Sequence, residues 1–364
     1  MTNYLLAGGG TAGHVNPLLA LAQHIRSVEP EAKLIALGTA EGLEARLVPE
    51  RGFELVTIER LPFPRKLNGY ALSFPLKFQR AVGQVARLIA DESIDVVVGF
   101  GGYASAPAYE AAKRTKTPLV IHEANALPGL ANIRAAKFAN AVGVAFKSAL
   151  KLKNAKLVGM PLRPEIEALL TAQDVTAARL HFGLQPDAPT LLVTGGSLGA
   201  KRINETIEQS RVALKAAGIQ VLHIVGPRSE LPEIDEPLYR RIGYCDRMDL
   251  AIAASNLAVA RAGAATVSEF AAIGLPAIYV PYPVGNGEQA LNAKDLCEAG
   301  GGVLVLDRDF IPEAVLSAVI PLASSPKQLK QMHQAALEQG ISNGTERLFD
   351  LVTGVLKAQP RRAV

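Results

Sequence analysis

Residues 5–14 read Leu5-Leu6-Ala7-Gly8-Gly9-Gly10-Thr11-Ala12-Gly13-His14, and the rest of the chain is organised around the pattern that this stretch begins. A short apolar run enters a glycine-rich loop, and an Ala- and Leu-rich segment of helical spacing follows. The order predicts a strand, a tight loop and a helix, with His14 in the first helical turn. Glycines let the backbone turn sharply, and the first N–H groups of a helix have no helical partner, so the loop suits a phosphate or another anion.

The same alternation continues through the first half of the chain. An amphipathic helix is predicted over residues 76–91, and a second glycine-rich loop over 99–105. Further strands are predicted at residues 33–37, 53–58, 94–98, 118–121 and 141–145. Continuous apolar strands separated by helices indicate a parallel sheet that is covered on both faces.

Two prolines at residues 161 and 164 interrupt the pattern and predict a linker, after which the architecture restarts. A third glycine-rich loop at 195–200 precedes a helix predicted over 202–216. Strands are predicted at residues 190–194, 220–225, 257–260, 277–280 and 303–306. We therefore expect an α/β protein with domains at 1–161 and 162–343, and with a last helix at 344–358 that packs back on the first domain.

The composition agrees with two soluble domains. The chain has 364 residues, 49% of them hydrophobic and 20% charged, which is ordinary for α/β proteins of this size. No apolar run is long enough to span a membrane, and we expect no signal peptide. The two cysteines, Cys245 and Cys297, suggest neither a disulfide framework nor a metal site. A net charge of +4 suits a nucleic acid, an anionic membrane or a phosphorylated substrate and decides among none of them.

The first loop also matches the dinucleotide pattern Gly8-x-Gly10-x-x-Gly13, so a nicotinamide enzyme has to be considered. Such a site needs an acidic residue at the end of the second strand to hold the ribose. This strand ends in Leu37-Gly38-Thr39-Ala40, and Glu41 lies beyond it. The pattern therefore favours a different ligand.

His14 has two readings from physical chemistry alone. It can be a helix-start residue that bonds a nearby carbonyl. Alternatively, the positive end of the helix dipole disfavours the imidazolium, which leaves a neutral ring that can accept a proton. A general base needs this state, so His14 is a candidate catalytic residue.

Three segments of the second half are candidates for ligand binding. Residues 261–269 follow a strand and open a helix, so their amides could hold an anion while Glu269 bridges two sugar hydroxyls or merely favours the helix start. Residues 286–292 are rich in amide and carboxylate groups, which suit a sugar or a solvated loop. Asp307-Arg308-Asp309 resembles a metal-binding triplet, but no third ligand is near, and we interpret it as a helix start.

Residues 61–78 mix apolar and cationic side chains, with prolines at 62, 64 and 75 that argue against a regular buried element at the start. Such a surface suits a membrane that bears anionic lipid, although core packing would explain any single residue. The candidate membrane or acceptor residues are Phe63, Arg65, Lys66, Phe74 and Phe78.

Taken together, the motifs resemble the MurG family of bacterial peptidoglycan N-acetylglucosaminyltransferases over nearly the whole chain. The motifs that carry the resemblance are residues 8–14, 99–103, 122–125, 195–200 and 261–269. It implies a GT-B fold, in which two Rossmann-like domains face each other across a cleft. It also implies transfer of N-acetylglucosamine from UDP-N-acetylglucosamine to the 4-hydroxyl of the muramoyl sugar of undecaprenyl-linked lipid I. The product would be lipid II, formed with inversion, for the cell wall and so for cell shape and division.

The resemblance also assigns roles to individual residues. The residues implied in donor binding are Thr11, Ala12, Gly13, Asn125, Arg163, Ser197, Cys245, Ala264, Ala265, Thr266, Val267, Ser268, Glu269, Gln289 and Asn292. Among them, Glu269 would take the ribose hydroxyls, the Ser197 loop the diphosphate, and Gln289 with Asn292 the sugar, while the backbone at Cys245 would face uracil. Family members often carry an apolar residue in place of Cys245, and Gln in place of Glu288.

His14 would then accept the proton of the attacking hydroxyl, and the first loop would belong to the acceptor side. The departing UDP would be stabilised by loop amides and helix N-termini without an obligatory metal. The resemblance implies a peripheral protein on the cytoplasmic face of the plasma membrane, against its anionic inner leaflet, with no nucleic-acid partner. Two alternative functions stay open. The first is another UDP-sugar enzyme of the same fold, either a glycosyltransferase or an epimerase. The second is a membrane adaptor that binds a nucleotide sugar and has no enzymatic activity.

Overall fold

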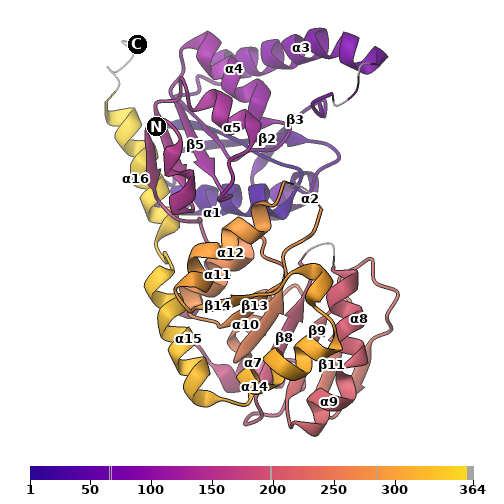
Figure 1. Ribbon diagram of the computed structural model, residues 1–364. Helices are drawn as coiled ribbons and strands as arrows, with labels where there is room; N and C mark the ends of the chain where they lie inside the picture. Colours follow the sequence, from indigo (N-terminus) through magenta and orange to yellow (C-terminus); the bar gives the residue numbers. More distant parts are fainter. Residues whose placement is uncertain (65, 67, 197–198, 285, 359–364) are drawn as a thin grey trace. The chain divides into compact units, whose positions relative to one another are not determined.

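The computed structural model describes residues 1–64, 66, 68–196, 199–284 and 286–358. The chain divides into two compact units, which are coloured along the sequence in Figure 1. The N-terminal unit comprises Met1–Arg163 together with the segment from Asn343 onward, and the C-terminal unit comprises Pro164–Ser342.

The N-terminal unit is built on a parallel sheet, as its apolar runs predict. Within the described residues this sheet has seven strands in the order β3-β2-β1-β4-β5-β6-β7, and every pair in it is parallel. Its strands are β1 (Asn3–Ala7), β2 (Lys33–Thr39), β3 (Glu54–Ile58), β4 (Val96–Gly99), β5 (Leu119–Glu123), β6 (Ala141–Val144) and β7 (Ala155–Leu157).

Helices cover both faces of this sheet, which explains why its strands are apolar at successive positions. The helices are α1 (Ala12–Val28), α2 (Glu44–Glu50), α3 (Gly69–Asp91), α4 (Ser105–Thr115), α5 (Leu130–Ala135), the 3₁₀ helix η1 (Lys147–Lys151) and α16 (Gly344–Lys357). Leu5 packs into the core beneath α3 and α4, whereas its neighbour Leu6 packs into the core beneath α1. The last helix, α16, contacts α1 and buries Leu348 and Val352 in that second core (Figure 1).

The C-terminal unit repeats this architecture. In the part of the unit that the structure describes, seven strands form a sheet in the order β10-β11-β9-β8-β12-β13-β14, and its β10–β11 pair is antiparallel. The strands are β8 (Thr190–Thr194), β9 (Gln220–Ile224), β10 (Ile234–Glu236), β11 (Tyr239–Ile242), β12 (Leu257–Ala260), β13 (Ala277–Tyr279) and β14 (Gly302–Leu304). The sequence did not predict β7, β10 or β11, because these short strands lack an apolar run.

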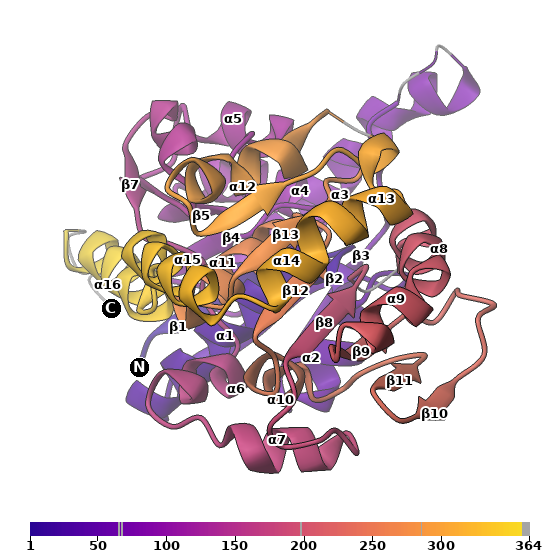
Figure 2. The same cartoon turned by 60° about the horizontal axis from the view of Figure 1, so that its bottom comes forward.

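The helices of the C-terminal unit cluster around this sheet. They are α6 (Pro164–Glu167), η2 (Ala168–Leu170), α7 (Val175–His181), α8 (Lys201–Gln209), α9 (Arg211–Ala216), α10 (Met248–Ala253), α11 (Ala264–Ile273), α12 (Glu288–Glu298), η3 (Asp307–Asp309), α13 (Pro312–Ala314), η4 (Val315–Val319), α14 (Ile320–Ala323) and α15 (Pro326–Gln339). Helices α8 and α9 contact each other, and α9 contacts β9 (Figure 2).

Two helix predictions need correction. The single helix predicted at 202–216 is broken at Ser210, whose hydroxyl donates to the carbonyl of Thr206 and bends the chain between α8 and α9. The helix predicted from residue 76 begins at Gly69 instead, because the side chain of Asn68 accepts from the N–H of Ala71 and caps the first turn. Pro75 lies inside this helix on an exposed position.

Candidate active site

The carboxyl ends of β1 and β4 mark the topological switch point of the N-terminal unit. From β1 the chain moves to β2 and β3 on one side, and the later strands lie on the other side, beyond β4. Ligands of open parallel sheets bind in the crevice that such a reversal leaves. The loop 8–14 follows β1 and the loop 99–105 follows β4, so both glycine-rich motifs of this half meet there.

His14 lies in the first turn of α1, as predicted, and its ring is half-buried. The Nδ1 atom is 3.1 Å from the carbonyl oxygen of Gly9 and 3.3 Å from the hydroxyl oxygen of Thr11. Because a carbonyl oxygen can only accept, the first contact requires a hydrogen on Nδ1. The lone pair of the neutral ring is then on Nε2.

The second glycine loop packs directly against the first. A Cβ atom on Gly102 would overlap the carbonyl oxygen of Gly9, and Gly102 has a φ of +87°. A Cβ atom on Gly101 would lie 3.1 Å from Nε2 of His14. Ser105 fixes the loop, since its hydroxyl oxygen lies 2.9 Å from the carbonyl oxygen of Ala7. The glycines therefore keep the Nε2 edge of the imidazole clear of side chains on this loop.

Burial lowers the pKa of His14 below its ordinary value, while the hydrogen bond to Gly9 and the charge of Glu44 act in the opposite direction. Desolvation dominates, so the neutral ring is favoured at neutral pH. A neutral imidazole with a free Nε2 can take a proton from a hydroxyl group, and this is the chemistry of a general base.

A buried carboxylate, that of Glu123, lies at the end of β5, within the motif 122–125 for which the sequence analysis gave Glu123 no role. The Glu123 carboxylate accepts from the backbone N–H groups of Asn125 at 2.8 Å and Gly129 at 3.0 Å, and from the side-chain amide of Asn132 at 2.8 Å. Burial raises the pKa of Glu123, and these hydrogen bonds oppose the shift. Glu123 therefore shapes the loop that carries Asn125, a predicted donor residue.

In the C-terminal unit the switch point lies between β8 and β12, and two of the predicted donor segments, 195–200 and 261–269, follow the carboxyl ends of these strands. The loop 195–200 follows β8 and precedes α8, but Ser197 lies outside the described residues. The segment after β12 opens α11, whose N-cap is Gly263. The free amides of Ala264, Ala265 and Thr266 form the first turn, as an anion site requires.

Arg261 holds the loop before α11 in place. Its Nη1 atom donates to the carbonyl oxygens of Val280 at 3.0 Å and Pro281 at 3.1 Å, and lies 2.6 Å from a carboxylate oxygen of Asp307. Asp307 belongs to the triplet that resembles a metal motif, and it begins the short 3₁₀ helix η3. Its carboxylate thus pairs with a guanidinium, in agreement with a structural interpretation of the triplet.

The remaining donor residues of the C-terminal unit occupy different environments. Glu269 and Val267 are buried in α11, so Val267 could meet a ligand only through its backbone. Gln289 accepts from the N–H of Tyr282 at 2.9 Å, which leaves its amide NH₂ group for a ligand. Cys245 is buried in the loop after β11.

Asn292, a further predicted donor residue, lies in the interior of the C-terminal unit. Asn292 was expected to contact the sugar, but its side chain is only 1% exposed and donates to the carbonyl oxygen of Ala262 at 3.2 Å. It therefore connects α12 to the loop before α11. In this arrangement the Asn292 side chain positions the loop.

The other predicted donor residues lie in the N-terminal unit. Thr11 is the exposed N-cap of α1, and Ala12 and Gly13 form the first turn next to His14. Arg163 is the last residue of the first segment of this unit and is half-buried.

The predicted membrane surface lies on and before α3, and only some of the predicted apolar residues are exposed. Phe63 and Lys66 are exposed, whereas Arg65 lies outside the described residues. Phe74 and Phe78 are half-buried and pack against the core beneath α3, because their face of the helix points to the sheet. Leu72 and Leu76 are exposed instead, at 84% and 60%.

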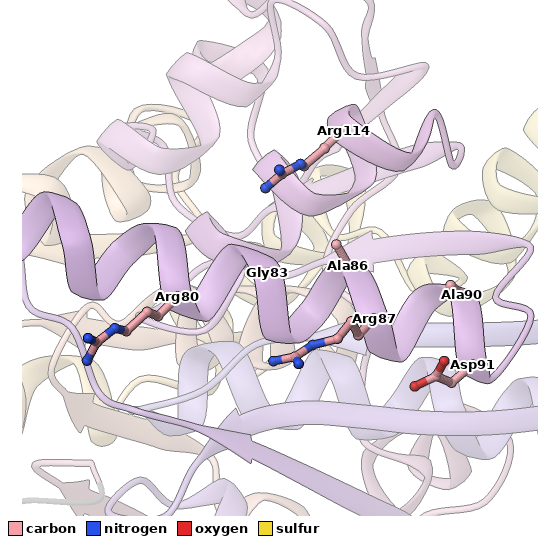
Figure 3. A pocket seen from close by; sticks show the side chains of 7 residues that line it. All are labelled: Arg80, Gly83, Ala86, Arg87, Ala90, Asp91 and Arg114. Carbon is pink, nitrogen blue, oxygen red and sulfur yellow. The ribbon is translucent and has the colours of Figure 1, made fainter.

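The exposed face of α3 continues into a cationic pocket. Arg80 and Arg87 extend from α3, and Arg114 comes from α4 (Figure 3). Gly83, Ala86, Ala90 and Asp91 complete the lining. Helical spacing places Leu72, Leu76, Arg80 and Arg87 along one side of α3, so two exposed leucines are followed by a surface with three arginines.

The described part of the chain contains no group of three or more His, Cys, Asp or Glu side chains arranged to hold a metal ion. None of its helices is long and apolar enough to cross a membrane.

Comparison with known proteins identifies the family. The model of the glycosyltransferase family 28 N-terminal domain matches residues 4–144, and that of the family 28 C-terminal domain matches residues 190–348. A relative in Clavibacter michiganensis subsp. michiganensis is 55% identical, with 100% of this chain and 99% of the relative covered. A relative in Leifsonia xyli subsp. xyli is 56% identical, with coverages of 98% and 100%. Both are named UDP-N-acetylglucosamine–N-acetylmuramyl-(pentapeptide) pyrophosphoryl-undecaprenol N-acetylglucosamine transferase.

Solved structures agree with these relatives. The crystal structure of MurG from Acinetobacter baumannii superposes with a TM-score of 0.76 at 26% identity, and covers 97% of this chain and 100% of that one. A putative UDP-N-acetylglucosamine 2-epimerase from Listeria monocytogenes shares the fold with a TM-score of 0.69 at 15% identity. The two Rossmann-like units and these neighbours assign the GT-B fold class, and the full-length relatives show that the chain belongs to the MurG family of N-acetylglucosamine transferases.

Proposed function

We infer that this protein transfers N-acetylglucosamine from UDP-N-acetylglucosamine to lipid I, which gives lipid II for peptidoglycan synthesis. Membership of the MurG family at 55–56% identity over essentially the whole chain carries this inference. The acceptor is the 4-hydroxyl of the muramoyl sugar of undecaprenyl-pyrophosphoryl-MurNAc-pentapeptide, and the reaction inverts the anomeric carbon.

His14 is proposed as the general base of a single in-line displacement. The acceptor oxygen forms the new bond to the anomeric carbon and gives its proton to Nε2, while the bond from that carbon to the diphosphate of UDP breaks. The hydrogen bond from Nδ1 to Gly9 supports this role, because it leaves the Nε2 lone pair free.

The departing diphosphate is proposed to be held by the loop 195–200 and by the amides at the start of α11, without an obligatory metal. Both elements leave the switch point of the C-terminal unit, and the free N–H groups of a helix start favour phosphate. Glu269 is proposed to bind the ribose hydroxyls, and the side-chain amide of Gln289 the sugar.

The protein is proposed to act as a peripheral protein on the cytoplasmic face of the plasma membrane. The exposed leucines of α3 and the arginines beside them support this, since apolar side chains can enter the acyl region while guanidinium groups meet anionic headgroups. Because the long lipid tail of the acceptor lies in the bilayer, the protein must reach the membrane surface to meet its acceptor.

The test is UDP release from UDP-N-acetylglucosamine with and without a lipid I analogue, in the presence of EDTA. We expect release that depends on the acceptor, persists in EDTA and forms a disaccharide product. UDP release without any acceptor would favour an epimerase of the same fold. Binding of the donor with no release under any condition would indicate an adaptor, and faster release with other UDP-sugars or lipid acceptors would indicate a different glycosyltransferase.

A further inference from the structure

Glu44, the first residue of α2, has a buried carboxylate that the mechanism above does not use. Its side chain is 1% exposed, yet both carboxylate oxygens accept hydrogen bonds. One oxygen accepts from the N–H of Gly10 at 2.7 Å. The other accepts from the N–H of Thr39 at 2.8 Å and from the Thr39 hydroxyl at 2.9 Å. A buried carboxylate with this set of donors is well satisfied without leaving the interior.

The glycines around Glu44 make room for it. A Cβ atom on Gly9 or on Gly42 would overlap the carboxylate itself. The glycine-rich loop after β1 therefore encloses a carboxylate of the protein, and the Gly10 amide, which could have faced a phosphate, is already engaged.

The engaged amide connects Glu44 to His14. The N–H of Gly10 and the C=O of Gly9 belong to one peptide group, and the described chain has no cis peptide bond, so they point in opposite directions. Glu44 bonds the N–H end, and the Nδ1–H group of His14 bonds the C=O end. Hydrogen bonds in such a chain polarise one another, so the carboxylate makes the Gly9 oxygen a stronger acceptor.

We propose that Glu44 is a positioning residue for the transfer reaction, which acts through the Gly9–Gly10 peptide to hold the His14 ring with Nδ1 protonated and Nε2 free for the acceptor proton. The proposal rests on the proposed role of His14 as the base. It makes Glu44, one peptide group away, the counterpart of the carboxylate that orients the histidine in many hydrolytic enzymes.

Other titratable groups near His14 do not supply this effect. His122 on β5 is fully buried, and burial lowers its pKa to about 4, so it adds no charge at neutral pH. Glu123 is engaged by Asn132 and two backbone amides. On the loop 99–105, the ring of Tyr103 packs against the guanidinium of Arg60, whose Cζ atom lies 4.8 Å from the ring centroid. The negative charge of Glu44, by contrast, raises the pKa of His14.

The experiment is an NMR titration of the full-length protein labelled with ¹⁵N-histidine, in which an H14Q variant assigns the His14 signal among six histidines. In the wild type we expect the tautomer with hydrogen on Nδ1. In E44Q the pKa of His14 should fall by about 0.5–1 unit, less than the 1–3 units typical of a charge in direct contact. The acid limb of the kcat profile should move to lower pH with it, and kcat on the plateau should fall about tenfold, less than the ~10²–10⁴-fold loss of the base itself.

The matched control is T39V, which removes a hydroxyl donor from the same carboxylate but keeps its charge and its bond to Gly10. We expect T39V to titrate like the wild type. A wild-type Nε2–H tautomer, an unchanged His14 pKa in E44Q, or an equal shift in T39V would overturn the proposal. The tautomer is measured on the wild-type protein, with H14Q used only to assign the signal, so poor folding of E44Q cannot hide the answer. The proposed role of His14 as the base is tested separately, because unchanged turnover in H14A would refute that role whatever Glu44 does.

Discussion

Replacing Leu72 and Leu76 together with Ser should weaken binding to anionic vesicles without damaging the enzyme. The two side chains are 84% and 60% exposed and lie on one side of α3, so in the free protein they add little to the core. Their transfer into the bilayer would remove this apolar surface from water.

The size of the effect follows from the exposed fractions. Full burial of one leucine side chain is worth about 1.5–3 kcal/mol, and scaling by the two exposures gives roughly 2–4 kcal/mol together. At about 1.4 kcal/mol per decade, the partition coefficient should fall by ~30- to ~1000-fold. The arginines of the neighbouring pocket should contribute a separate, salt-dependent part of about 1 kcal/mol each.

The assay is sedimentation with phosphatidylglycerol-containing vesicles, run beside turnover of a water-soluble acceptor analogue. The matched control carries Val212→Ser and Leu180→Ser, which lie in the C-terminal unit and are 78% and 63% exposed. We expect the control to bind vesicles like the wild type, and both variants to use the soluble acceptor normally. Vesicle binding that survives in L72S/L76S, or falls equally in the control, would refute the reasoning.

Three further predictions concern the interior. His14→Ala should lower kcat by about 10²–10⁴-fold with little change in donor affinity by calorimetry, and the wild-type acid limb should lie below the ordinary histidine pKa because burial lowers the pKa of His14. Asp307→Asn should raise the donor KM roughly tenfold and leave kcat nearer to wild type, because Arg261 loses the charge that fixes the α11 loop; an unchanged KM would contradict this. Burial lowers the pKa of His122 to about 4 and of His223 to about 3, so the unfolded chain takes up protons first as pH falls. Stability in urea should therefore be full above pH ~6.5 and decline below it by up to ~1.4 kcal/mol per pH unit for each histidine, and a flat profile would show otherwise.

The sequence by itself determined the fold class and most of its elements. Apolar runs bounded by glycine loops predicted strands such as β1, β4 and β8, and the structure confirms parallel sheets built from them. These signals are local, because a buried strand and the helix that follows it are each formed by a contiguous stretch with its own apolar pattern. His14 was located for the same reason, since its position depends only on where the helix α1 begins.

Local signals fail where a contact partner is distant along the chain. The pattern of α3 could not tell which aromatic residues face the sheet, so Phe74 and Phe78 were predicted on the surface that Leu72 and Leu76 occupy. Similarly, nothing near Asn292 indicates that its amide holds the carbonyl of Ala262.

How His14 is held became visible only in the tertiary structure. Strand order places β1 beside β2, and this brings Thr39 and Glu44 to the glycine loop that the sequence interpreted as an anion site. Glycines permit close approach by any acceptor, and a sequence does not show whether that acceptor is a ligand or the protein itself. Only the folded chain shows that the loop encloses Glu44, because a hydrogen bond between residues 10 and 44 depends on the path of the backbone between them.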